Sequence, residues 1–476
     1  ECGRDMVQYL RGMYAFAIWD TGTKTLFAAR DRLGIKPFYY RHKDGSFTFA
    51  SEIKSILAVS AEPSTVDRSL IDAYMDFGYV PGEQTMHSGF QRLLPGHFLL
   101  WHEGRLQSSS YWDLRFDSQR DNGTDDHADA IRSLLEGSIN LHLRSDVPLG
   151  VFLSGGLDSS AVVSLLAPGA SAGLKTFSVA YEFGLDYDET RYARQVSAAF
   201  RTDHHEVRVT PDQFVDFLPQ YIWHMDEPVT EAAAISLYYV AKLAREHVTV
   251  GLSGEGSDEL FAGYDFYQYN MAIEAGRRLL GGGAFRSLAS AVRGIKGMAK
   301  LRKYLDLAAE PLERRYRGIS SYEQSQKRKL YTTGFDELAG RGNGRCAGFI
   351  EDLFKKTRGL DALSRMLFFD TKTWLVDDLL TKADRMSMAN SLELRVPFLD
   401  HRLVEYAATI PSKHKIRRGS SKFVLKKALK NALPAAILSR RKMGFPTPLE
   451  EMLRRDLSRV RDAVERQQLD RLRVIA

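Results

Sequence analysis

The chain has 476 residues, a formal net charge of +6, 44% apolar and 26% charged residues, and two cysteines. This length exceeds one typical hydrophobic core and favours two domains. Two cysteines are too few for a disulfide framework, and no uninterrupted apolar run approaches the roughly eighteen residues of a membrane-spanning helix. We therefore expect a globular protein of the reducing cytoplasm with no membrane segment.

Residues 1–117 contain short apolar runs separated by turn sequences, a pattern typical of β-structure. The runs at 13–19 and 26–29 flank Asp20-Thr21-Gly22-Thr23 and predict a hairpin. The other elements predicted here are strands over 37–41 and 46–50, a short helix over 68–77 and a second hairpin around 98–104.

From residue 127 onward, strand patterns alternate with helix patterns. This alternation predicts a parallel sheet with helices on both faces, and such sheets bind ligands beyond the carboxyl ends of their strands. The polar stretch over 117–126 precedes the change, so we predict domains over 1–117 and 118–476. The predicted elements are helix 129–140, strand 149–153, helix 159–167, strand 175–180, helix 188–200, strand 205–209, helices 211–224 and 233–246, strand 248–252 and a helix over 363–388.

An apolar strand, Val151-Phe152-Leu153, ends in Ser154-Gly155-Gly156, and helix-compatible residues follow from Ser159. Two glycines allow a sharp turn and a close approach of the backbone to a ligand, and the start of the following helix attracts an anion. The carboxylate of Asp158 can hold a divalent cation against that anion. The stretch predicts a pyrophosphate site with its own metal ligand. The alternative is a tight strand-to-helix connection with no ligand.

A second turn of this kind follows the strand over 248–252 and contains Ser253, Gly254, Glu255 and Asp258. In a parallel sheet it can face the first loop, where its aspartate can share a metal ion with Asp158. Glu255 can act as a base or orient the substrate. The alternative is an acidic helix N-terminus, where carboxylates are favoured by the helix dipole.

The stretch over 413–442 holds eleven lysines and arginines and no acidic residue. A nucleic-acid surface is one explanation, but Phe423 is the single aromatic residue among the charges, so we expect no nucleic-acid partner. We predict a solvated helix face that turns partly toward an anionic substrate. Lys442, beside a glycine-bounded turn, can neutralise charge that develops on a phosphate.

Together these motifs resemble the glutamine-hydrolysing asparagine synthetase family over nearly the whole chain. One such motif is Ala-Ser-Glu-Ile-Lys over 50–54. The other matching segments are 10–20, 30–40, the two loops, 187–189, 226–228, 382–388 and 440–445.

The resemblance implies an α/β fold. Residues 1–117 would form the later part of a β-rich N-terminal-nucleophile glutaminase domain. Residues 118–476 would form a synthetase domain of the ATP-pyrophosphatase, or adenine nucleotide α-hydrolase-like, type. Similar enzymes use ATP and Mg²⁺ to convert aspartate to β-aspartyl-AMP and pyrophosphate, and ammonia released from glutamine then gives asparagine and AMP.

The resemblance also implies roles for individual residues. Glu255 matches a residue that acts in forming the adenylate, and Lys442 matches the active-site lysine. The ATP-contacting positions are Leu153, Val179, Ser253 and Gly254, the pyrophosphate loop contains Ser154, Gly155, Gly156, Asp158 and Ser159, and the Mg²⁺ ligands are Asp158 and Asp258.

One feature departs from the family, which opens with a nucleophilic cysteine followed by residues that hold glutamine. Cys2 stands only a few residues before the segment over 10–20, which lies late in the family's glutaminase domain, so Cys2 matches a surface position. We therefore expect a chain that lacks a domain-sized N-terminal piece and uses ammonia alone as nitrogen source. A homodimer is possible. The alternatives are a relative that adenylates another acid, such as a β-lactam-synthetase-like enzyme, or an inactive relative.

Overall fold

The fold is described from a computed structural model. The residues that the structure describes are 2–60, 63–117, 121–169, 173–181, 189–293, 295, 297–318, 327, 329–331, 346–440, 442 and 458.

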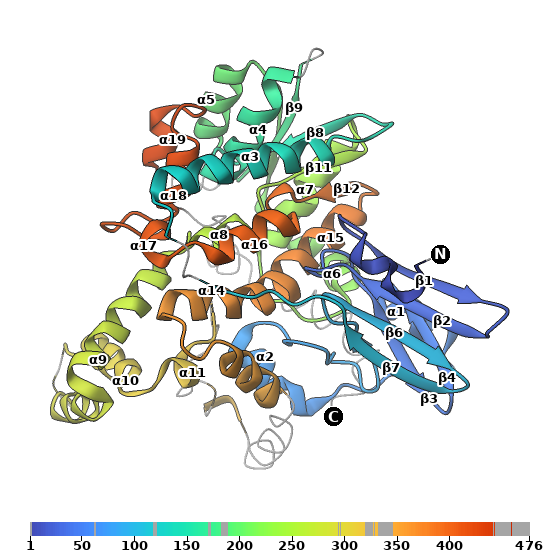
Figure 1. The fold of residues 1–476 in the computed structure, drawn as a ribbon, viewed down its shortest axis with the longest axis horizontal. Coiled ribbons are helices and arrows are strands. Elements are labelled where there is room, and N and C mark those ends of the chain that lie inside the picture. Colours follow the sequence, from blue (N-terminus) through green and yellow to red (C-terminus); the bar gives the residue numbers. More distant parts are fainter. Residues whose placement is uncertain are drawn as a thin grey trace.

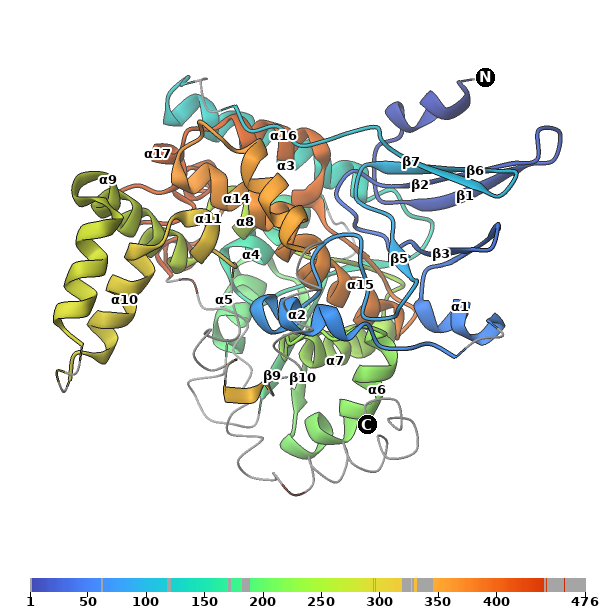
Figure 2. The ribbon, with the colours of Figure 1, turned by 90° about the horizontal axis from the view of Figure 1, so that it is seen from below.

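The first part of the chain contains two antiparallel sheets, with strand orders β1-β2-β6-β7 and β4-β3-β5, seen at the right of Figure 2. A cluster of buried apolar side chains from both sheets, including Ala28, Tyr40 and Leu99, lies between them. Both predicted hairpins are confirmed, and so is the short helix, as the 3-10 helix η2 (Arg68–Leu70) followed by α2 (Ile71–Phe77). The strands are β1 (Ala15–Asp20), β2 (Thr25–Arg30), β3 (Tyr39–Lys43), β4 (Ser46–Ala50), β5 (Gln91–Arg92), β6 (His97–His102) and β7 (Arg105–Ser110); helix α1 covers Ile53–Val59.

The second part contains the predicted parallel sheet, with strand order β10-β9-β8-β11-β12. Its adjacent strands β8 and β11 are apolar runs that are buried at every position except the half-buried Leu149, as expected for a sheet covered on both faces. The last strand, β12, is only three residues long and was not predicted. The strands are β8 (Leu149–Phe152), β9 (Lys175–Tyr181), β10 (Asp203–Val209), β11 (Val250–Leu252) and β12 (Glu393–Arg395).

Helices cover both faces of this sheet. Because side chains alternate along a strand, Val151 joins the large core with α4 and α5, while Phe152 joins a smaller core with α7 and α15. Helix α3 packs on α4 and also on α18, beside which it lies in Figure 1. The helices are α3 (Thr124–His142), α4 (Leu157–Leu166), α5 (Thr190–Phe200), α6 (Pro211–Met225), α7 (Ala233–Arg245), α15 (Thr381–Met388) and α18 (Phe423–Ala428).

The predicted helix over 363–388 is interrupted. It begins as α14 (Ala362–Lys372), breaks at Thr373, where φ is −128° and ψ is −80°, and continues as the π-helix η5 (Trp374–Leu380) before α15. The hydroxyl of Thr373 donates to the carbonyl of Phe369 at 2.8 Å within this break. π-Helical turns of this kind are frequent at functional sites.

The remaining helices follow β11 or β12 along the chain. Helix α9 contains a non-helical residue, Gly281, within its glycine triplet, and pairs with α10 in a hairpin that projects from the molecule (Figures 1 and 2). These helices are α8 (Ser257–Phe261), α9 (Asp265–Ala291), α10 (Ala299–Ala309), α11 (Leu312–Arg315), α16 (His401–Thr409), α17 (Ser412–Lys415) and α19 (Ala435–Ser439).

Candidate active site

Two loops meet at one edge of the parallel sheet. β8 ends at Phe152 and β11 ends at Leu252, and because the two strands pair in parallel, the loops that follow them lie at the same edge. The loops are in direct contact. A Cβ added at Gly254 would lie 2.7 Å from the Cβ of Asp158 and 2.9 Å from the backbone nitrogen of Ser159. A side chain at position 254 would therefore push the loops apart.

The first loop is a tight turn that leads into α4. Gly155 has φ +70°, and a Cβ there would lie 2.4 Å from the backbone nitrogen of Ala193 in α5, so the turn requires glycine. Ser154 Oγ accepts from the N–H of Gly156 at 3.2 Å, and Ser159 Oγ accepts from the N–H of Ser154 at 3.2 Å. The ten-residue helix α4 follows, and its unpaired N–H groups and positive dipole end favour an anion at this turn.

Two lysines bridge the carboxylates of the two loops. Nζ of Lys422 lies 2.6 and 2.7 Å from the carboxylate oxygens of Asp158 and 2.6 Å from Oδ1 of Asp258. Nζ of Lys442 lies 2.6 Å from Oδ2 of Asp258 and 4.0 Å from Oδ2 of Asp158. The hydroxyl of Ser257 donates to Oδ1 of Asp158 at 2.7 Å. These side chains form one charged cluster, named here the loop cluster.

Two members of the loop cluster, Asp258 and Lys442, have pKa values shifted in favour of their charged forms. Burial acts to raise the pKa of the Asp258 carboxyl, but Lys422 and Lys442 outweigh burial and lower that pKa. Burial acts to lower the pKa of Lys442, but the carboxylates of Asp258 and Asp158 outweigh it and raise that pKa. Asp258 and Lys442 are therefore both charged at neutral pH. The ammonium of Lys442 is available to an anionic ligand that binds at the loop cluster.

Lys422 is a member of the loop cluster that was not singled out from the sequence. It lies in the basic run, for which we predicted a solvated helix face, yet its side chain is only 4% exposed and Lys415 is also buried. For these two residues the prediction is wrong, because acidic partners or packing from distant segments cover them. Lys422 precedes α18 in the left-handed conformation, with φ +51° and ψ +33°, which is uncommon for a side-chain-bearing residue. The turn sequence Gly419-Ser420-Ser421 is the local signal that could have pointed to it.

The loop cluster lies in the wall of a cavity of about 310 Å³. Glu189 and Arg440 form an ion pair in the same wall, and the guanidinium of Arg440 lies 4.0 Å over the ring of Tyr192. Gly155 is the sequence-predicted residue that is absent from the wall, since it packs against α5 instead. The sequence-predicted residues in the wall are Leu153, Ser154, Gly156, Asp158, Ser159, Val179, Ser253, Gly254, Glu255, Asp258 and Lys442.

A second charged group surrounds Lys382 of α15, whose side chain is 8% exposed. Its Nζ lies 3.6 Å from Oε2 of Glu231 and 3.9 Å from Oδ1 of Asp378. Burial acts to lower the pKa of Lys382, but these carboxylates and Glu255 outweigh it and raise that pKa. Burial raises the pKa of the Glu255 carboxyl, against the opposing effect of Lys382 and Lys442. In this group one cation, Lys382, lies among several carboxylates.

The β-rich part contacts the parallel-sheet region through a buried ion pair. Arg92 of β5 donates to Oδ1 of Asp377 in η5 at 3.0 Å, and the N–H of Gly82 donates to Oδ2 of the same carboxylate at 2.8 Å. Cys2, by contrast, is exposed at the start of the 3-10 helix η1 (Gly3–Gln8). Among the described residues, no helix is both long and apolar enough to cross a membrane.

Comparison with known families assigns both parts of the chain. The model of the asparagine synthase family matches residues 130–475, which include both loops and both lysines of the loop cluster. The chain belongs to the asparagine synthase family. The model of a glutamine amidotransferase domain matches residues 1–112. The division at residue 117 falls between the two matches and stays a prediction.

Several curated proteins are similar to this chain over nearly its whole length. Glutamine-hydrolyzing asparagine synthetase 1 of Bacillus subtilis (strain 168) is 36% identical over 464 residues, which cover 97% of this chain and 72% of the relative. Glutamine-hydrolyzing asparagine synthetase 3 of the same organism is 33% identical over 462 residues, covering 94% and 69%. Amidase chyE of Penicillium rubens is 27% identical over 487 residues, covering 94% and 71%.

Proposed function

We propose that this chain is a ligase that amidates aspartate with ATP. It converts the side-chain carboxylate of aspartate to β-aspartyl-AMP with release of pyrophosphate, and ammonia then displaces AMP to give asparagine. The observation that carries the proposal is the loop cluster, in which Asp158, Lys422 and Asp258 converge inside the region matched to the asparagine synthase family.

The loop cluster fits a triphosphate with Mg²⁺. Asp158 and Asp258 converge closely enough for one ammonium to contact both, and carboxylate and phosphate oxygens are the ligands that Mg²⁺ prefers. Mg²⁺ held there would neutralise charge on the phosphate oxygens. The turn over Ser154–Ser159 and the start of α4 offer N–H and hydroxyl donors to the pyrophosphate.

Lys442 and Lys422 stabilise the charge that develops as pyrophosphate leaves. Their ammonium groups already lie at the carboxylates of the loop cluster, so they reach the phosphate oxygens bound beside those carboxylates without reorganisation. Leu153 and Val179 supply apolar contacts for the nucleoside, and Ser253 and Gly254 line the same cavity.

The second charged group offers a partner for the ammonium of aspartate and for one of its two carboxylates. Lys382 binds a carboxylate of the amino acid, and Glu231 binds its ammonium. Glu255 lies in the same wall, and it orients the carboxylate for attack on the nucleotide. An acid without an ammonium would leave Glu231 without its proposed partner.

The test of this function is pyrophosphate release by the full chain with ATP, Mg²⁺ and single acids: aspartate, glutamate, succinate and N-acylated aspartate. Release with aspartate alone supports the proposal. Preference for another acid would assign the chain to a different adenylating activity, and no release with any acid would contradict catalysis.

We expect ammonia to be the nitrogen nucleophile and Cys2 to have no part in its supply, because Glu1 precedes Cys2 and its thiol has no free amine of the same residue to activate it. Asparagine formation with free ammonia and with glutamine, compared side by side for the wild type and for Cys2→Ala, checks this expectation. We also infer a cytoplasmic location, where ATP and aspartate are available. A homodimer stays a prediction for light scattering to check.

A further inference from the structure

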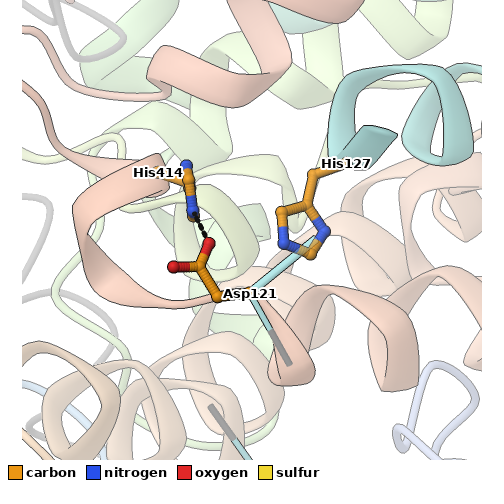
Figure 3. Close-up of side chains that lie close together, drawn as sticks. All are labelled: Asp121, His127 and His414. Carbon is orange, nitrogen blue, oxygen red and sulfur yellow. Dashed lines mark hydrogen bonds and ion pairs between the residues drawn. The ribbon is translucent and has the colours of Figure 1, made fainter. Parts of the chain in front are cut away.

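Three metal-ligating side chains come together outside the nucleotide cavity. Asp121 lies in the segment before α3, His127 in the first turn of α3, and His414 in α17. One ligand atom from each of the three residues lies within 4.8 Å of the others. Figure 3 shows the two imidazoles and the carboxylate grouped around a common point.

The side chains are held in ligand geometry by neighbouring hydroxyls. Nε2 of His414 lies 2.8 Å from Oδ1 of Asp121, and its Nδ1 lies 2.8 Å from the hydroxyl of Thr124. Nδ1 of His127 lies 2.9 Å from the hydroxyl of Tyr406. Metal-binding histidines usually have their second ring nitrogen hydrogen-bonded in this way, which fixes the tautomer and the orientation of the ring.

We propose that Asp121, His127 and His414 bind a divalent transition-metal ion, with Zn²⁺ as its representative. Two imidazoles and one carboxylate are ligands typical of zinc and its neighbours, whereas Mg²⁺ and Ca²⁺ prefer sites made of oxygen. Both histidines are buried, at 0% and 6% exposure, while the Asp121 side chain is 44% exposed. The exposed side gives the ion an entry path and a place for a water as fourth ligand.

Binding replaces one hydrogen bond with metal bonds to both of its atoms, while His127 supplies the third protein ligand. The ion takes the place of the proton between Nε2 of His414 and Oδ1 of Asp121, this proton is released to water, and His414 binds as the neutral imidazole. Lys413 pairs with the other carboxylate oxygen of Asp121 and can stay there. Thr124 and Tyr406 then accept hydrogen bonds from the Nδ1–H groups of the two rings.

The ion would tie together segments that are distant in sequence. Its ligands join the segment before α3 to α17, and the chain runs from α17 directly to Lys422 of the loop cluster and into α18, which packs on α3. Zinc at this point therefore anchors the stretch that carries Lys422. The zinc site can be tested independently of the proposed function, because the test measures metal binding and not turnover.

The experiment measures Zn²⁺ binding to the full chain, purified without an affinity tag and freed of metal, by competition with a chromogenic chelator. Asp121→Asn is the principal variant, because Asp121 is exposed and its loss spares the fold. Asp125→Asn is the matched control, since Asp125 is an exposed aspartate at the same helix start that pairs with Lys427. Asp158→Asn separates binding at the loop cluster from binding here.

We expect one tight equivalent of zinc in the wild type, in Asp125→Asn and in Asp158→Asn. Tyr406→Phe removes the hydroxyl that contacts Nδ1 of His127 and should lower the affinity for zinc roughly 10- to 100-fold. Asp121→Asn and His414→Gln remove ligands and should lower the affinity further. Zinc should also raise the thermal midpoint of the wild type but not of Asp121→Asn. Equal affinity in the wild type and Asp121→Asn, or loss of the tight equivalent in Asp158→Asn alone, would overturn the proposal.

Discussion

Lys422 lies between two carboxylates that belong to different loops, and Lys442 adds a second cation to the same group. The loop cluster is therefore balanced in charge before any ligand binds. In a buried group of this kind, removal of one partner leaves an uncompensated charge, which costs far more than an exposed ion pair contributes. The cluster is thus the proposed binding site and also a constraint on which residues its positions tolerate.

The carboxylates are the first residues to test. Asp158→Asn and Asp258→Asn keep the shape of the side chain but remove the charge that holds the lysines and the proposed Mg²⁺. We expect pyrophosphate release to fall below detection in both variants, with unchanged circular dichroism. Ser257→Ala, which removes a hydroxyl that donates to Asp158 and accepts from Lys422 but leaves all four charges, should cost much less. Full release by both asparagine variants would refute the assignment.

The lysines should affect the adenylation rate itself. Loss of one charge-stabilising donor typically costs about 3 kcal/mol, or roughly 100- to 1,000-fold in rate, and we expect this for Lys442→Ala and for Lys422→Ala. Lys430→Ala is the matched control, since Lys430 belongs to the same basic run but is exposed. Single-turnover pyrophosphate release at saturating ATP and aspartate measures the effect. Wild-type rates in Lys442→Ala would place that lysine outside the chemistry.

At the scale of elements, the loops could be predicted because their signals are local. A buried apolar strand, two glycines and a helix start follow one another within a dozen residues, and the parallel sheet brings the second loop to the same edge. The structure adds what no local pattern contains. Lys422, which follows α17, itself has the left-handed backbone conformation at the loop cluster. The short strand β12 forms by pairing with β11, a neighbour that is distant in sequence.

The break at Thr373 was missed for a related reason. The apolar periodicity continues through η5, so the sequence pattern is that of one long helix, while buried charges on η5 meet partners elsewhere in the fold. Asp377 binds Arg92 of β5, and Asp378 lies near Lys382. These contacts come from the tertiary structure, so the apolar pattern alone could not reveal the π-helical segment.

One buried carboxyl should make stability depend on pH. Asp370 of α14 accepts hydrogen bonds from the hydroxyls of Tyr267 at 2.6 Å and Tyr316 at 2.5 Å, and burial raises its pKa to about 7. The unfolded chain has the ordinary pKa of about 4, so between these values the native state binds the proton and the unfolded state does not. The free energy of unfolding therefore falls by about 1.4 kcal/mol per unit as pH rises through this window.

Asp370→Asn removes this titration while keeping an acceptor for both tyrosines. Between pH 5.5 and pH 7 we expect the wild type to lose about 2 kcal/mol more stability than the variant, because only the wild type must ionise a buried carboxyl. Urea unfolding of both proteins at the two pH values measures the difference. Parallel pH dependences would show that Asp370 titrates as an ordinary carboxyl.

At the scale of the whole molecule, Arg92 joins the β-rich part to the parallel-sheet region. It is 4% exposed, donates to Asp377 and lies 3.7 Å from Oε2 of Glu227. Arg92→Ala would leave two buried carboxylates without their cation, and such a loss costs about 3–5 kcal/mol. We expect a correspondingly lower urea midpoint for this variant.

Arg132→Ala provides the matched control for this prediction. Arg132 forms an exposed ion pair with Glu136 one helical turn away in α3, at 2.9 Å, and pairs of this kind contribute less than about 1 kcal/mol. Equal losses in the two variants would mean that the Arg92 pair contributes no more than a surface contact.

The register of the parallel sheet has a consequence for the order of folding. Val250 pairs with Leu149 on one side and with Glu393 on the other, so the strands that position the two loops come from widely separated parts of the chain. Contacts of such long sequence separation close large loops and form slowly. We therefore expect the cavity proposed for the nucleotide to be completed late. On that proposal a partly folded chain has no place to bind ATP, and nucleotide should stabilise only molecules whose central strands have already met.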